Sequence, residues 1–415
     1  MAPSDSWTSY QNMSCDSEQA RKIQQLLLTA NFPFLCTTAV QLRSTLAEAP
    51  QAIGQTLTCS IDSTKFASGM NNVVVELRFS DSEYWIARIR LPTNPIHDAA
   101  VEASIRSEIT TINLVSSRTS IPIPKVYGSD VSTTNPFGFR YILMEALPGH
   151  VPDSSFAKTV PQSKWDKVAE QFADYYFQLS NLRFDHIGSL SSGLDTADEL
   201  SIAPYNGSGP FSTSLEYFHN TRKKQTRAIK SAHGNDEQWS TAAWILEQAL
   251  PAMVVEEYVR GPFPLCHMDL HYGNILVDDD YNITGIIDWS DAQTVPLERF
   301  IITPEFAMFP GLSDEKSAPS IAFREKFAAV LRTKELAARM IPDGPPPIAD
   351  MLGTPLWEIV YRCTYSYHWR ALTDSRLVLR QMYGEDAKFE DFMTFYKNGP
   401  VNFKGAKPIS GRLRM

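Results

Sequence analysis

The stretch 266–277, which reads CHMDLHYGNILV, carries the polar residues best suited to catalysis. Asp269 precedes Asn274 in it, and Asp288 follows further along the chain. Alternating apolar residues predict two strands around the acidic turn 278–282, so a hairpin would bring Asn274 and Asp288 to the same end. An amide oxygen and a carboxylate suit Mg²⁺, which prefers oxygen ligands and keeps water and substrate phosphates as the others. Asp269 would then remain free to act on a second substrate.

A second hypothesis takes the same residues as a different metal site. His267, Asp269, His271 and Asp288 have types and spacing compatible with a metallohydrolase cluster. The sequence contains no further histidine pair of this kind, which favours the magnesium interpretation.

Composition excludes several classes of protein. The 415 residues are 43% hydrophobic and 20% charged, which is ordinary for a folded chain. The formal net charge of −9 argues against a nucleic-acid-binding protein and suits a cationic or metal-complexed small ligand. Five scattered cysteines and a polar N-terminus without a long apolar run predict a cytoplasmic protein that has no membrane partner. No pattern in the sequence indicates the oligomeric state.

The order of predicted elements indicates an α+β chain. Period-2 patterns predict strands at 56–61, 73–79, 84–89 and 139–143, and 3.6-residue periodicity predicts a helix over 97–118. Beyond Gly149 helical patterns dominate, at 163–182, 215–231, 239–259, 323–340 and 356–372. We therefore expect an N-terminal extension over 1–49, a β-rich lobe over 50–148, a helical lobe over 149–400 and a basic tail over 401–415.

The string H-x-D-x-x-x-x-N followed by Ile286-Ile287-Asp288-Trp289 resembles the aminoglycoside phosphotransferase/choline kinase family. The segment Ala87-Arg88-Ile89 is similar to the third strand of uncharacterised fungal members. This resemblance implies a bilobal protein-kinase-like fold with a small β-rich N-lobe and a larger, mainly helical C-lobe. It also implies ATP and Mg²⁺ as cofactors.

The resemblance assigns roles to individual residues. Arg88 would stand where most of the superfamily has a phosphate-binding lysine, and a helix glutamate would hold it. On the predicted helix Glu108 falls within about 20° of Val101, inside the apolar face, and Glu102 falls near 100°, at the edge of that face, so Glu108 is the expected partner. The remaining roles are the phosphate loop with Ser68, Gly69 and Asn71, the adenine-binding hinge with Met144, Glu145 and Leu147, the metal ligands Asn274 and Asp288, and the catalytic base Asp269.

These roles imply transfer of the γ-phosphate of Mg-ATP to a hydroxyl of a small molecule, such as an amino alcohol, an aminoglycoside-like compound or a secondary metabolite. Met268 stands where protein kinases carry arginine, and no Ala-Pro-Glu follows Asp288, which disfavours a protein acceptor. Aromatic residues in 356–372 belong either to the core or to a pocket for an organic cation. Asp291 and Glu298 are either solvated acids or partners of a cationic acceptor. The alternative function is an ATP-binding pseudoenzyme or scaffold without transfer activity, which only the arginine at 88 favours.

Overall fold

The structure of the protein is a computed structural model. It describes residues 2–7, 9, 14, 17–46, 56–152, 160–192, 200–304, 314–338, 348–352, 354–364 and 368–398. The chain forms two compact units, one of Met1–Pro152 with Gly273–Ser290 and one of Asp153–Tyr272 with Asp291–Met415. The predicted tail 401–415 lies outside the described residues.

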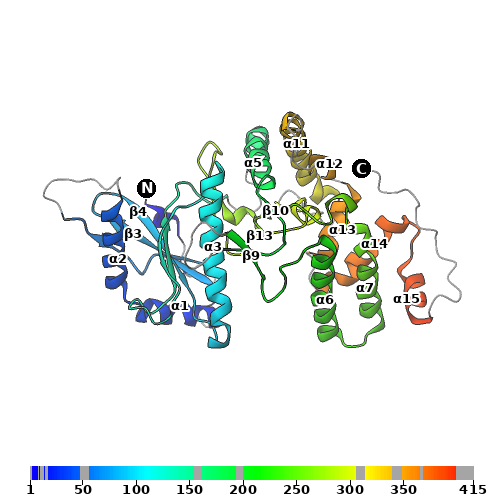
Figure 1. Cartoon of the computed structure of the whole chain (residues 1–415), viewed down its shortest axis with the longest axis horizontal. Helices are drawn as coiled ribbons and strands as arrows, with labels where there is room; N and C mark the ends of the chain where they lie inside the picture. The colour runs from blue at the N-terminus through cyan, green and yellow to red at the C-terminus, as the bar shows by residue number, and fades with distance from the viewer. Residues whose placement is uncertain are drawn as a thin grey trace. The chain divides into compact units, whose positions relative to one another are not determined.

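The first unit is built on an antiparallel sheet with strand order β1-β3-β4-β6-β5, of which Figure 1 labels β3 and β4. β2 pairs with Val73–Val75 of β3, on the same edge where β1 pairs with Arg78 and Phe79. The predicted hairpin is confirmed, because Val75 lies opposite Ala87 and Leu77 opposite Trp85. β5 was not expected from the sequence, and β1 is shorter than the strand predicted over 56–61. The bounds are β1 Cys59–Ser60, β2 Phe66–Ser68, β3 Asn72–Phe79, β4 Tyr84–Arg90, β5 Val126–Asp130 and β6 Tyr141–Glu145.

Three long helices accompany this sheet: α1 (Glu18–Thr29), α2 (Phe32–Thr45) and α3 (Asp98–Arg118). α1 and α2 contribute Ile23, Leu26, Leu35 and Ala39 to the core that also contains the buried side chains of β3 and β4. Removing these apolar side chains from water supplies the main stabilisation of the unit. The predicted helix over 97–118 is confirmed by α3.

The hairpin expected around the acidic turn also forms, as β11 (Ile275–Val277) and β12 (Ile283–Ile286). It belongs to the first unit although it lies far along the chain. The backbone of His150 exchanges two hydrogen bonds with that of Val277, and Ile286 N–H donates to the Pro122 carbonyl at 2.8 Å. Backbone pairing therefore fastens the hairpin to the residues that follow α3 and β6.

The second unit is mainly helical, as predicted. In Figure 1, α6 and α7 run side by side, and α13, α14 and α15 follow toward the C-terminus. The helices are α5 Trp165–Ser180, α6 Ser214–His233, α7 Glu237–Gln248, α8 Leu250–Met253, α9 Leu297–Phe300, α11 Asp314–Ala338, α12 Ile348–Met351, α13 Pro355–Thr364, α14 Ala371–Tyr383 and α15 Phe389–Asn398. The expectation of an α+β chain with a β-rich N-terminal part and a helical C-terminal part is confirmed.

Short strands complete this unit. β10 (Phe263–Cys266) pairs with β7 (Arg183–Phe184) and β13 (Gln293–Thr294). β8 (Ser189–Ser192) pairs with β9 (Leu200–Ala203). β9 lies within 195–210, a segment whose composition in the sequence is that of a linker. β10 leads directly into the loop that carries Asp269.

Two helix predictions were wrong in their extent. The pattern over 239–259 is interrupted, since α7 ends at Gln248 and a four-residue helix with Pro251 in its first turn follows. Proline lacks the N–H that a continuing helix would use, and its ring clashes with the preceding turn. The pattern over 356–372 is divided between α13, a 3-10 turn over His368–Arg370 and the first residues of α14.

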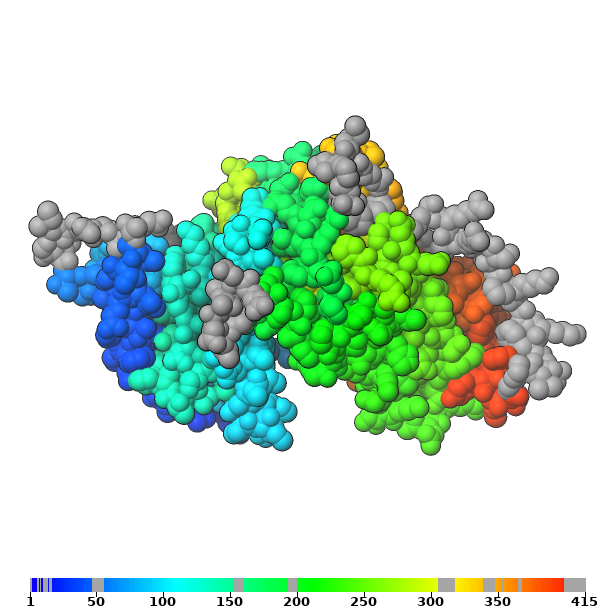
Figure 2. Space-filling view, viewed as in Figure 1, coloured from blue at the N-terminus to red at the C-terminus, as the bar shows by residue number. Residues whose placement is uncertain are grey.

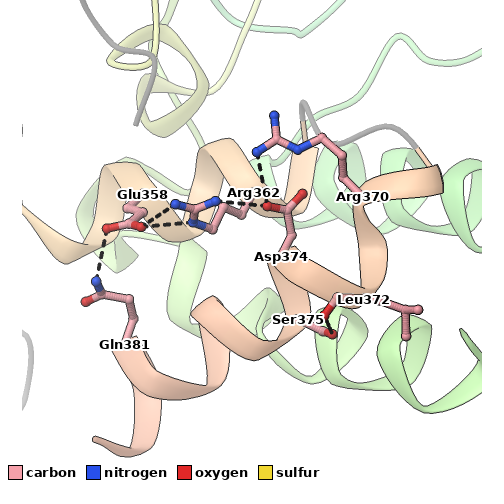
Figure 3. Close-up of polar contacts among 7 residues, drawn as sticks. All are labelled: Glu358, Arg362, Arg370, Leu372, Asp374, Ser375 and Gln381. Carbon is pink, nitrogen blue, oxygen red and sulfur yellow. Dashed lines mark hydrogen bonds and ion pairs between the residues drawn. The ribbon is translucent and has the colours of Figure 1, made fainter. Parts of the chain in front are cut away.

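A buried ion network joins α13 to α14 (Figure 3). Arg362 donates to Asp374 Oδ1 at 2.9 Å and, through Nε and Nη2, to Glu358 Oε1 at 2.9 and 2.7 Å. Arg370 approaches Asp374 at 3.4 Å, and Gln381 donates to the second oxygen of Glu358. Arg362 and Asp374 are almost fully buried, so each charge depends on the other for solvation.

Among the described residues, no helix combines the length and apolar character that crossing a bilayer requires.

Asp374→Ala should lower the free energy of unfolding by up to about 3–5 kcal/mol, because it removes the fully buried partner of Arg362 and leaves only Glu358, which is 22% exposed. Urea denaturation followed by tryptophan fluorescence measures this change. Asp174→Ala is the matched control: Asp174 pairs with Lys334 at 2.8 Å but is 41% exposed, so we expect a cost below about 1 kcal/mol. Equal costs for the two variants would contradict a stabilising role of the α13–α14 network.

Candidate active site

Arg88 is the centre of the polar site in the first unit. It lies on β4 between Val74 of β3 and Ile142 of β6, and its side chain is buried. One guanidinium nitrogen forms an ion pair with Glu108 of α3. The other donates to Asp288 Oδ1 at 2.6 Å. The two arms of one guanidinium therefore hold carboxylates from two distant parts of the sequence.

These two carboxylates keep Arg88 charged. Burial alone would lower the pKa of Arg88, but the nearby Glu108 and Asp288 charges outweigh it and raise the pKa above its ordinary value. A permanently charged, preoriented guanidinium is suited to bind phosphate oxygens.

The structure shows which of the two helix glutamates, Glu102 or Glu108, contacts Arg88. Glu108 is 4% exposed and contacts Arg88. Glu102 instead pairs with Arg106 one turn later, at 2.8 Å on the exposed surface. The angle on the helical wheel explains the difference, because only the Glu108 position faces the sheet.

The hairpin places Asn274 and Asp288 at its same end, as its sequence pattern predicts. Ile275 lies opposite Ile286, and Ile287 N–H donates to the Asn274 carbonyl at 3.0 Å. Asp288 has a φ of +61°, a left-handed conformation that aspartate tolerates better than most residues and that often marks functional positions. An amide and a carboxylate at one end of the same hairpin supply the kind of oxygen donors that Mg²⁺ prefers.

Asn72, at the start of β3, is a neighbour of Arg88. The sequence predicts it only as the last residue of the phosphate loop 67–72, not as a contact of Arg88. With its side-chain amide oriented to satisfy both of its neighbours, its oxygen accepts from Arg88 Nη2 at 2.7 Å and from Nε at 3.3 Å.

The predicted phosphate loop forms the connection between β2 and β3. Ser68 ends β2 and pairs with Val73, while Gly69 N–H donates to the Asn72 carbonyl at 3.0 Å. The carbonyl of Asn71 accepts from Leu91 N–H at 2.9 Å. The loop is thus a tight hairpin turn whose end adjoins the strand of Arg88.

The predicted hinge begins at the end of β6. Met144 is buried, and Glu145 lies opposite Trp85. Glu145 N–H donates to the Lys125 carbonyl at 2.9 Å, so this N–H is used by the sheet. An adenine contact at the hinge would therefore involve the Glu145 carbonyl or the backbone of Leu147.

The second unit contains the predicted catalytic base. Asp269 follows β10, its side chain is 49% exposed, and its Oδ2 lies 3.6 Å from His271 Nε2. The Asp269 carbonyl also accepts from His271 N–H at 2.9 Å. His267 is 2% exposed, as expected for a residue that orients the loop.

No three His, Cys, Asp or Glu side chains in the described part of the chain are placed to hold one metal ion. The metallohydrolase hypothesis therefore finds no support in these residues.

A cavity of about 660 Å³ adjoins Asp269 within the second unit. Its lining combines aromatic rings with amides, hydroxyls and charges, and its volume is that of a site for a drug-sized molecule. The residues that carry its chemistry are Tyr205, Phe211, Tyr217, Asn220, Lys224, Gln225, Asp269, Asp291, Arg299 and His368. Apart from Asp269, Asp291 and His368, the sequence offered no motif for them.

A model of the phosphotransferase enzyme family matches residues 62–298, more than half of the chain. The chain belongs to this phosphotransferase family. Its match includes Arg88, Glu108, Asp269, Asn274 and Asp288.

The individual relatives to which the chain is similar are distant. A subtelomeric hrmA-associated cluster protein of Aspergillus fumigatus is 30% identical over 39% of the chain, and the match spans 31% of that relative. Clavilactone A biosynthesis cluster protein Y of Ampulloclitocybe clavipes is 23% identical over 69% of the chain and 76% of its own length. The phosphotransferase APH(2")-IIa, solved as a ternary complex with streptomycin and ATP, is 14% identical over 79% of this chain and 92% of its own, with a TM-score of 0.44.

Asp291 and Glu298, the two acids beyond Asp288, have different environments in the structure. Asp291 lines the cavity and accepts from the Tyr205 hydroxyl at 2.8 Å. Glu298 is fully buried and accepts from Val255 N–H at 2.7 Å and from the Ser214 hydroxyl at 3.4 Å. The sequence left a solvated acid open for Glu298, and that interpretation was wrong because the residue lies on α9 in the core.

Burial raises the pKa of Glu298 from 4.5 to about 7, although the hydrogen bonds from Val255 and Ser214 partly oppose it. A carboxyl group whose pKa is raised in the folded state stabilises the fold below its unfolded pKa. That stabilisation is lost as the pH rises through the folded pKa. The relevant window is therefore about pH 4.5–7.

Glu298→Gln should remove this pH dependence, because the amide reproduces the neutral acid. The variant should match the wild type near pH 5 and be more stable at pH 8, by roughly 3 kcal/mol at most. Thermal and urea denaturation across this range measure the difference. The exposed Glu257→Gln is the control and should follow the wild type throughout. A Glu298→Gln variant that is less stable than the wild type at pH 8 would argue against the raised pKa.

Proposed function

We propose that this phosphotransferase transfers the γ-phosphate of Mg-ATP to a hydroxyl group of a small molecule. The observation that carries the proposal is the position of Arg88, which is buried, charged and held by Glu108 beside the oxygen donors Asn274 and Asp288. Such an arrangement concentrates one cation and a hard-oxygen ligand set in a single unit, which is what a triphosphate with its metal requires.

In the nucleotide unit, Arg88 binds the α- and β-phosphates, and Glu108 orients it. Arg88 must exchange Asp288 for phosphate oxygens when the nucleotide binds, which frees the Asp288 carboxylate. Asn274 and Asp288 would hold Mg²⁺, which supplies charge neutralisation on the phosphates when bound. The backbone of Glu145 and Leu147 binds adenine, with Met144 behind it.

In the helical unit, Asp269 accepts the proton of the acceptor hydroxyl as its oxygen attacks the γ-phosphorus. The bond between that phosphorus and the β–γ bridging oxygen breaks, and ADP leaves. Asp269 is half-exposed at a cavity large enough for a drug-sized acceptor, which supports this role. Little covalent chemistry is needed, because positioning and charge neutralisation provide most of the acceleration.

A protein that binds ATP without transferring phosphate is the second candidate. The hydrogen bond from Arg88 to Asp288 favours it, because this contact occupies a metal-ligand oxygen and must break before the site can work. Turnover distinguishes the two candidates, since the proposed enzyme consumes ATP in proportion to the phosphorylated acceptor.

Asp288→Ala should abolish the Mg²⁺-dependent part of the stabilisation by ATP, because it removes a metal-ligand carboxylate. The measurement is the melting temperature with millimolar ATP, with and without Mg²⁺. Asp279→Ala, an exposed residue in the turn of the same hairpin, is the control and should keep the full shift. The absence of any shift in the wild type would refute nucleotide binding itself.

Asp269→Asn should lower kcat at least about 100-fold, because it removes the proton acceptor while preserving size. The shift of melting temperature by Mg-ATP should be unchanged. An assay of ADP release with a panel of hydroxylated acceptors measures turnover, and the exposed Asp185→Asn serves as control. Wild-type turnover retained in Asp269→Asn would rule out this mechanism.

A further inference from the structure

The charges around the cavity of the helical unit carry information about the acceptor. Two carboxylates line it, Asp269 and Asp291, and two permanently charged bases, Lys224 and Arg299, line it as well. His368 adds a group that becomes cationic when protonated. The described lining therefore has no excess of negative charge, whereas a polycationic ligand would require one.

Both carboxylates are already engaged. Asp291 accepts a hydrogen bond from the Tyr205 hydroxyl, and the carboxylate raises the pKa of that tyrosine together with the larger effect of burial. Asp269 lies beside His271 and is assigned to the acceptor hydroxyl. Asp269 is thus reserved for the reacting hydroxyl. Asp291 is the other carboxylate of the described lining that could attract an ammonium group, and one of its two oxygens already accepts from Tyr205.

The bases differ from each other. Arg299 is 4% exposed and donates to the Thr303 hydroxyl at 3.3 Å, so it is part of the cavity floor. Lys224 on α6 is exposed, and no described carboxylate lies within 4.0 Å of its ammonium group. α6 belongs to the continuous green surface of the helical unit in Figure 2. Lys224 is therefore accessible to an incoming ligand.

The uncharged part of the lining is aromatic. Phe211 and Tyr217 meet edge to face with centroids 6.1 Å apart, and Tyr205 adds a third ring. Rings at this spacing favour a flat apolar frame over a heavily hydrated sugar, since burying aromatic and apolar area is the main gain that such walls offer.

We infer that the acceptor is an aromatic hydroxylated molecule that carries an acidic group, and that Lys224 binds this group. The inference rests on the proposed function and gives its substrate class. Asp269 takes the hydroxyl proton, the rings of Tyr205, Phe211 and Tyr217 contact the frame, and the Lys224 ammonium pairs with the carboxylate or other acid. Polycationic sugars are poor ligands for this cavity because its positive groups repel them.

Three probes with a common frame test this inference: 3-(4-hydroxyphenyl)propionate, its neutral methyl ester and the cationic tyramine. Kanamycin serves as the polycationic probe. Isothermal titration with the full chain, with and without Mg-ADP, gives each dissociation constant. The acid should bind at least about tenfold more tightly than the ester, tyramine or kanamycin.

Two substitutions on α6 test whether Lys224 binds the acidic group. Lys224→Met keeps the aliphatic stem and removes the charge, so it should reduce affinity for the acid about tenfold and leave the ester unaffected. Lys223→Met is the matched control: this neighbour on α6 is exposed but does not line the cavity, and its substitution should change neither affinity.

Several results would overturn the inference: no binding of the acid up to about 10 mM, equal affinities for acid and ester, preference for tyramine or kanamycin, or an acid affinity that Lys224→Met leaves intact. The melting-temperature shift by Mg-ADP, measured on the same samples, keeps this result separate from the proposed function. A retained shift with a failed acid probe refutes only the acceptor class. A lost shift refutes nucleotide binding, and the titrations without nucleotide still decide the acceptor class.

Discussion

The first unit depends on the burial of one arginine charge. Arg88 on β4 contacts Glu108 of α3 and Asp288 of the β11–β12 hairpin, so three segments far apart in sequence meet at a single guanidinium. A buried charge without such partners would be strongly destabilising, and the buried Glu108 would be as costly without Arg88, whereas Asp288 is 40% exposed. The ion pairs thus tie the fold of this unit and the assembly of its candidate nucleotide site to the same contacts.

An arginine at this position also changes what nucleotide binding involves. Its planar fork contacts both carboxylates at once through different nitrogens, whereas a lysine presents one compact ammonium group. The contact with Asp288 neutralises that carboxylate before any metal does. In the proposed cycle, phosphate takes the place of Asp288 at Arg88, and Mg²⁺ takes the place of Arg88 at Asp288. The cost of breaking the internal ion pair is therefore offset only when ATP and its metal bind together.

In the helical unit, too, a buried arginine is held by carboxylates from different segments. The network of Glu358, Arg362 and Asp374 joins α13 to α14, and the end of α13 and the residues before α14 contribute Thr364 and His368 to the cavity. Glu298 is close in sequence to the candidate site residue Asp288, but it lies in the core, where Val255 and Ser214 donate hydrogen bonds to it. Its raised pKa makes it partly neutral near pH 7. Glu298, Glu358 and Asp374 therefore interact with other residues of the protein, although the composition alone would suggest that they could bind a cationic substrate.

The sequence by itself determined the hairpin of Asn274 and Asp288, the strand of Arg88, the choice of Glu108 over Glu102 and the division into β-rich and helical parts. These features follow from local periodicity, which records which face of each element is buried. Local patterns do not show where one helix ends and the next begins. For this reason 239–259 and 356–372 were each predicted as one helix, although each is divided between shorter elements. Only the tertiary structure decided the cavity lining, the engagement of Asp291 by Tyr205 and the exposure of Lys224. Those depend on contacts between residues dozens of positions apart, and such contacts leave no periodic trace in the chain.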